Sequence, residues 1–108
     1  MDEMSKNNKT RLIFSDINLA NQLFGDYNKN LKKIEALVDV SIHARGNTVF
    51  VQGDSIAENL SKNILKQLYS LLKEGYPIYP KDVDYAVRIL SEDDRINLKD
   101  IFLDKVYV

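Results

Sequence analysis

The sequence predicts an α+β domain in which helices pack on one face of a three-stranded sheet. Three short stretches, residues 10–15, 40–45 and 48–53, alternate apolar and polar side chains, which is typical of strands. Most of the stretches between and after them repeat apolar residues every three to four positions, which is typical of amphipathic helices. The predicted order is strand, helix, helix, strand, strand, helix, with an extra C-terminal helix.

The first strand and the first helix are marked by alternation and by a stop signal. In TRLIFS, Leu12 and Phe14 fall on one side of a strand. The segment INLANQLF follows as a short helix, with Ser15 or Asp16 as its N-cap and Gly25 as its end.

A second helix begins around Asp26. Its apolar residues lie four, three and four positions apart, so they predict one buried stripe. This stripe comprises Tyr27, Leu31, Ile34 and Val38, and Leu37 widens it.

VSIHAR and TVFVQG form a predicted hairpin around the two-residue loop Gly46-Asn47. Both loop residues tolerate a positive φ. The register places every small aliphatic side chain on one face. Its pairs are Arg45 with Thr48, Ala44 with Val49, His43 with Phe50, and Ile42 with Val51.

The longest helix starts with a capping-box pattern from Ser55 to Glu58 and stops at Gly75. Its predicted buried stripe consists of Ile56, Leu60, Ile64, Leu68, Leu71 and Leu72. A last helix starts at Pro80, a favoured first helical residue, and it buries Val83, Val87 and Leu90. We expect a disordered lead-in over residues 1–9, the folded domain over 10–91, and a charged linker over 92–108.

Composition narrows the function classes. A chain of 108 residues predicts one domain. The absence of cysteine excludes disulfides and thiolate chemistry. No apolar run approaches the ~20 residues of a membrane span, and the polar N-terminus has no signal-peptide core. We therefore expect a cytoplasmic protein with no membrane partner.

Catalysis by this chain is not expected. It has one histidine, His43, and no GxxxxGK[ST] motif to hold a nucleotide. The acidic pair Asp93-Asp94 lies in a charged stretch that suggests solvated surface rather than an acid/base pair. We predict no catalytic residue, no metal site and no cofactor in this chain.

The order of elements is that of the KH-type fold, which binds single-stranded RNA through a GXXG loop between its first two helices. Here the loop reads Gly25-Asp26-Tyr27-Asn28. Gly25 lets the backbone approach phosphate, and Asn28 can replace the second glycine because asparagine tolerates the left-handed region.

Basic residues follow that loop. Lys29, Lys32 and Lys33 share one helical face and can track a phosphate backbone. Arg45, at the hairpin end, can contact phosphate or stack on a base. Asp26 opposes phosphate binding, and the alternative is an ordinary solvated lysine face beside a degenerate loop.

The outer face of the sheet is a second candidate surface. It carries two large apolar residues, Ile13 and Phe50, beside His43. Such an uncovered pair indicates contact with another domain or subunit. The alternative is that the C-terminal segment IFLDKVYV folds back over it.

Several spaced features give the chain a family resemblance. They are Leu23-Phe24-Gly25, Asn30-Leu31, Ile34-Glu35, Arg45-Gly46-Asn47, Gly53, Leu68-Tyr69 and Asp82-Val83, across residues 12–90. In this combination and order the chain resembles the N-terminal, KH-like domain of PhoH-like proteins.

The resemblance implies a non-catalytic domain of a bacterial, cytoplasmic protein named for phosphate starvation and linked to RNA metabolism. The parent would carry a P-loop ATPase domain with ATP and Mg²⁺, and neither Walker motif occurs here. Single-stranded RNA, the ATPase domain of the same chain, and neighbouring subunits of a parent homo-oligomer are the implied partners. Arg45 would then serve RNA or the ATPase domain.

Overall fold

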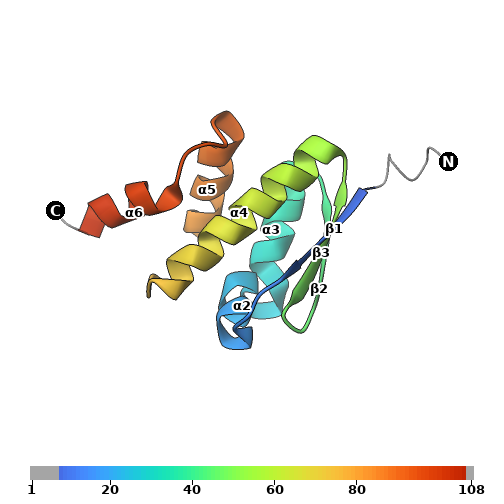
Figure 1. The fold of residues 1–108 in the computed structure, drawn as a ribbon, viewed down its shortest axis with the longest axis horizontal. Helices are drawn as coiled ribbons and strands as arrows, with labels where there is room; N and C mark the ends of the chain where they lie inside the picture. Colours follow the sequence, from blue (N-terminus) through green and yellow to red (C-terminus); the bar gives the residue numbers. More distant parts are fainter. Residues whose placement is uncertain (1–7, 107–108) are drawn as a thin grey trace.

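The computed structural model describes residues 8–106 and contains one sheet with helices on one of its faces (Figure 1). The elements follow the predicted order, with a short 3-10 turn inserted and one more helix added. They are β1 (Asn8–Ile13), α2 (Ile17–Phe24), the 3-10 turn η1 (Asp26–Asn28), α3 (Lys29–Val38), β2 (Ser41–Arg45), β3 (Thr48–Gly53), α4 (Ser55–Lys73), α5 (Pro80–Glu92) and α6 (Leu98–Val106).

The sheet is antiparallel, with β3 between β1 and β2. The predicted hairpin register is confirmed at every pair, from Ile42 opposite Val51 to Arg45 opposite Thr48. Strand alternation sends Leu12, Val49 and Val51 toward the helices, and all three are buried. The apolar pattern therefore fixes both the pairing and the buried face.

The core lies between that face and helices α2 to α5. Most residues of the predicted stripes are buried there: Leu31, Ile34, Ile64, Leu68, Leu71, Leu72, Val83, Val87 and Leu90. Burying a side chain of this size stabilises the fold by roughly 1.5–3 kcal/mol. The predicted α+β architecture is confirmed.

Residues 14–16, which follow β1, are fixed by contacts with Tyr69 of α4. The Phe14 ring lies 4.7 Å from the ring of Tyr69 on α4. The Tyr69 hydroxyl accepts a 2.9 Å hydrogen bond from the backbone N–H of Asp16. Asp16, rather than Ser15, is the N-cap of α2, and its carboxylate accepts from the N–H groups of Asn18 and Leu19.

Three predicted core residues are exposed instead. Tyr27 lies in the turn before α3, where it is 93% exposed. Leu37 is 53% exposed, and Ile56, in the first turn of α4, is 81% exposed. Periodicity assigned them to stripes, but no element among residues 8–106 covers the ends of these two helices.

The predicted capping box is also wrong. Asp54, not Ser55, caps α4, because its Oδ1 accepts from the N–H of Ala57 at 2.8 Å. Glu58 does not reach back to the cap. It is buried, and its Oε1 accepts a 2.7 Å hydrogen bond from the Thr10 hydroxyl. Glu58 therefore joins α4 to β1.

The segment assigned to a linker contains α6, which packs against α4 at the end of the molecule away from the sheet (Figure 1). Leu98 at its start is fully buried. The packed body thus extends beyond residue 91, and β1 begins at Asn8, inside the expected lead-in. Residues 1–7 and 107–108 lie outside the described part of the chain. A further domain beyond residue 108 stays a prediction.

Candidate nucleic-acid interface

The turn between α2 and α3 is built from unusual backbone conformations. Gly25 has φ 82° and ψ 170°, a region that is essentially restricted to glycine. Tyr27 and Asn28 both adopt the left-handed conformation, with φ 55° and 59°. The predicted left-handed Asn28 is therefore present, and a bulky tyrosine shares that conformation beside it.

Packing below the turn explains why Gly25 lacks a side chain. A Cβ at this position would lie 2.9 Å from Nδ2 of Asn30. Asn30 is buried, and that same Nδ2 donates a 3.0 Å hydrogen bond to the carbonyl of Leu23. Asn30 thereby fixes the end of α2 to the start of α3, and the turn must be glycine to admit it.

The start of α3 is open to an anion. The N–H of Lys29 donates to the carbonyl of Asp26. The Asn28 side chain makes no capping hydrogen bond, so it does not satisfy the N–H groups that follow. The side chains of Lys29 and Lys32 are exposed on the first turns. The absence of a side-chain cap and the positive end of the helix dipole both favour a phosphate here.

Lys33 differs from its two neighbours. Its Nζ lies 3.3 Å from Oδ1 of Asp84 on α5, and the lysine side chain is about one third exposed. This ion pair joins α3 to α5. The predicted three-lysine face is thus two solvated lysines beside one that is already paired.

A cavity of about 410 Å³ adjoins the turn. Gly25, Asp26 and Lys29 line it on one side, and residues 77–80, which lead into α5, line it on the other. Ile78 and Tyr79 were not selected from the sequence, where Pro80 indicated only the start of a helix. Their apolar side chains give this basic end of the molecule a recessed wall.

Arg45 lies at the same end of the molecule but on another face. The β2–β3 turn and the start of α3 both occupy the lower end of Figure 1. Alternation along β2 places the exposed Arg45 with Ser41 and His43, on the sheet face away from the helices. The structure therefore separates Arg45 from the lysines by the thickness of the sheet.

The Gly46-Asn47 loop beside Arg45 makes contacts that stabilise the fold. Gly46 supplies the positive φ of 63°, and Asn47 keeps a negative one. The Asn47 side chain donates a 2.6 Å hydrogen bond to the carbonyl of Phe14, and its own carbonyl accepts from the Phe14 N–H at 3.0 Å. Asn47 thus joins the hairpin to Phe14, directly after β1, and neither contact uses the Arg45 side chain.

The outer face of the sheet is not covered by α6, which packs against α4 instead. Ile13 is 63% exposed on it, and His43 is exposed as well. Phe50 is only half-buried on the same face, although it has an interaction of its own. The suggestion that the C-terminal segment covers this face is not supported by residues up to 106, because α6 packs on α4.

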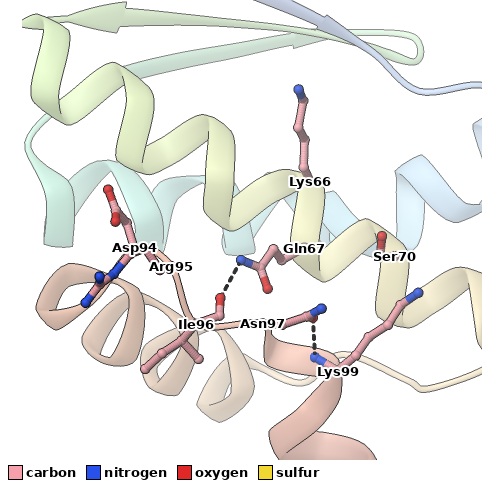
Figure 2. A pocket seen from close by; sticks show the side chains of 8 residues that line it. All are labelled: Lys66, Gln67, Ser70, Asp94, Arg95, Ile96, Asn97 and Lys99. Atoms are coloured by element: carbon pink, nitrogen blue, oxygen red, sulfur yellow. Dashed lines mark hydrogen bonds between the residues drawn. The ribbon is translucent and has the colours of Figure 1, made fainter.

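Figure 2 shows a pocket between α4 and residues 94–99, with Gln67 at its centre. Gln67 donates to the carbonyl of Ile96 at 2.9 Å and accepts from the N–H of Leu98 at 2.6 Å. The basic side chains of Lys66, Arg95 and Lys99 point in different directions. This pocket is therefore a junction that holds α6 rather than a site built around an anion.

Metal and membrane signatures are both missing from the part of the chain that the structure describes. No three side chains of the usual metal-binding types gather there. None of its helices is both long and apolar enough to cross a membrane.

The known proteins that this chain resembles in sequence all carry the same name, PhoH-like protein. No family model matches the chain. It is 31% identical over 72 residues to a PhoH-like protein of Bacillus subtilis, which covers 67% of this chain and 23% of that protein. PhoH-like proteins of Mycobacterium leprae and Mycobacterium tuberculosis are 29% and 26% identical over 68 residues, 63% of this chain in each case. The chain thus spans about one fifth of the length of these relatives.

One solved structure shares the fold. It is a crystal structure of a protein of unknown function from Aeropyrum pernix, with a TM-score of 0.61. The match covers 92% of this chain and 55% of the other, at 16% sequence identity. At that identity the likeness concerns the arrangement of helices and strands alone.

Proposed function

The chain belongs with the PhoH-like proteins as the counterpart of one segment of them, and from this premise we propose that it is a non-catalytic domain that binds single-stranded RNA. In this proposal it presents the RNA to a P-loop ATPase domain of the parent protein. ATP and Mg²⁺ belong to that further domain, and the setting is the bacterial cytoplasm.

The observation that carries the proposal is the turn before α3. It combines a glycine-only backbone at Gly25, a helix start without a side-chain cap, and two solvated lysines, Lys29 and Lys32. Phosphate oxygens are bound by such backbone N–H groups and lysines without any sequence requirement. Asn28 supports this use, because its left-handed backbone extends the turn as a second glycine would.

The test is a fluorescence-anisotropy titration with a short single-stranded RNA at low and near-physiological salt. We expect weak, saturable binding that decreases steeply with salt, because few phosphate contacts dominate it. The double substitution Lys29→Glu with Lys32→Glu should lower affinity at least about tenfold, since it replaces two attractive charges by repulsive ones.

The matched control is Lys62→Glu with Lys66→Glu, which makes the same charge change on α4. This control should lose much less affinity than the α3 pair. Equal losses would mean that net charge alone governs binding, and no binding by the unmodified chain at low salt would reject the proposal. Lys33 is left unchanged because removing its ion pair with Asp84 confounds binding with stability.

Exposure of Ile13 favours a second candidate function, assembly through the outer sheet face. Here the partner is the ATPase domain or a neighbouring subunit of the parent, and Arg45, His43 and Phe50 border the contact. Ile13→Glu should weaken parent assembly without unfolding the domain. A parent whose assembly is unchanged by this substitution would reject that face.

A further inference from the structure

An apolar groove opens where α3 ends and α4 begins. It has a volume of about 570 Å³ and is lined by Leu37 and Val38 of α3 and by Ile56, Ala57 and Leu60 of α4. Ile56 is 81% exposed and Leu37 is 53% exposed. Two large apolar side chains thus face water from opposite walls of one groove, which marks a contact surface.

The groove continues toward the end of α5. An adjoining cavity of about 530 Å³ shares Ile56 and Leu60 and adds Leu90 with residues 91–95. Acidic side chains surround the two cavities. Asp54, Glu92 and Asp94 are exposed there, whereas Asp93 is paired with Arg95 at 3.1 Å. The guanidinium of Arg95 lowers the pKa of the Asp93 carboxyl through that hydrogen bond. The rim therefore carries net negative charge.

The opposite end of α3 has the complementary composition. Tyr27 protrudes there at 93% exposure, the highest among the large apolar side chains of the described residues, with Ile56 next. Lys29 and Lys32 follow it on exposed positions. The exposed Asp26 precedes the ring, so with Lys29 and Lys32 the turn keeps a net charge of +1. An aromatic ring on a turn of net positive charge matches an apolar groove with an acidic rim.

We propose that the groove at Leu37, Ile56 and Leu60 receives the Tyr27 turn of a second copy of this chain. The ring of Tyr27 enters the groove, and Lys29 and Lys32 approach the carboxylates of Asp54 and Glu92. Both surfaces belong to every copy and lie at opposite ends of α3. The contact is therefore head-to-tail, and it propagates to further copies unless a ring closes.

The proposed contact between two copies is expected to be weak, because it buries little surface. One aromatic side chain and its neighbours bury far less than the roughly 1,000 Å² of a stable interface. Charges on the rims are exposed, so salt screens them over about 8–10 Å at physiological strength. Association is therefore expected at high protein concentration and low salt.

The test is sedimentation velocity over a concentration series to about 1 mM, with two single variants. Ile56→Asp removes the groove, and an acid in the first turn of α4 suits the helix dipole. Tyr27→Gly removes the ring and relieves its positive φ. The unmodified chain should grow beyond a dimer as concentration rises, while each variant alone stays monomeric.

A mixture of the two variants tests whether the contact is head-to-tail. Ile56→Asp keeps a working turn and Tyr27→Gly keeps a working groove, so an equimolar mixture should form a heterodimer that grows no further. Ile13→Asp, the same kind of change on the sheet face, should associate like the unmodified chain.

Three outcomes would overturn the proposal. They are a monomeric unmodified chain at about 1 mM, a mixture that does not associate, and loss of association in Ile13→Asp. A monomeric unmodified chain would mean that the groove binds a different partner. A mixture that does not associate would indicate a symmetric contact, and loss of association in Ile13→Asp would mean that the sheet face makes the contact. Circular dichroism establishes in each case that the variants are folded.

Discussion

The two ends of α3 differ in charge, in backbone conformation and in what surrounds them. The first turn carries Lys29 and Lys32 behind a turn of three positive-φ residues. The last turn leads to Asp39 and to an apolar groove with an acidic rim. A net charge of −1 for the whole chain conceals this separation.

This distribution opposes the helix dipole. Acids near an N-terminus and bases near a C-terminus stabilise a helix by about 0.3–1 kcal/mol each. In α3 no acid occupies the first turn and no base the last, and lysines stand where acids would help. Helix stability thus does not account for these charges, whereas the two proposed contacts would use them.

The largest expected change in stability comes from a substitution of Gly25, at the basic end of α3. Gly25→Ala should lower the free energy of unfolding by about 2–3 kcal/mol, because alanine strains this backbone and its Cβ meets Asn30. Urea denaturation measures it. The control is Gly75→Ala, where φ is also positive but no atom lies within 4 Å, and the loss should be about 1 kcal/mol. Similar losses in both variants would show that Asn30 yields easily.

An intermediate effect concerns the acidic end at Asp39. This residue caps α3 with φ 66°, a conformation that glycine adopts without cost. Asp39→Gly should raise the free energy of unfolding by about 1 kcal/mol, because it relieves the backbone and removes an acid from the negative end of the helix. Thermal unfolding measures it. Asp39→Asn removes only the charge and should give a smaller gain, so an equal gain would assign the whole effect to charge.

The smallest effect separates binding from stability at Lys29. Lys29→Glu should raise the free energy of unfolding by about 0.5 kcal/mol, because an acid suits the first turn of α3. The same variant should bind single-stranded RNA more weakly. Lys29→Gln serves as the neutral control, with intermediate values in both measurements. A variant that loses stability and RNA affinity together would instead indicate a structural role for Lys29.

The hairpin shows where sequence patterns predict structure reliably. Alternation in both strands leaves one register that buries Ile42, Val49 and Val51 together, and Gly46 supplies the turn. A shift of one residue would expose the entire apolar set. The order of the helices followed equally from caps and stops at Asp16, Gly25 and Pro80.

The misassigned residues show why patterns fail at helix ends. Tyr27 was placed one turn before Leu31, but the 3-10 turn delays the start of α3 to Lys29 and breaks that spacing. Ile56 has the correct helical spacing to Leu60, yet within the described part of the chain no segment covers it at the first turn of α4. The candidate lysines were identified from the sequence, but the Asp84 partner of Lys33 lies 51 residues away and carried no local signal.

The sequence by itself determined the α+β class, the order of elements, the hairpin register and the charged residues around the turn before α3, because periodicity and turn chemistry are local properties. Only the tertiary structure decided which of those residues remain accessible. It paired Lys33, exposed Tyr27 and Ile56, and packed residues 94–99 against Gln67. Each of these outcomes depends on which distant segment packs nearby, and a local pattern does not contain that information.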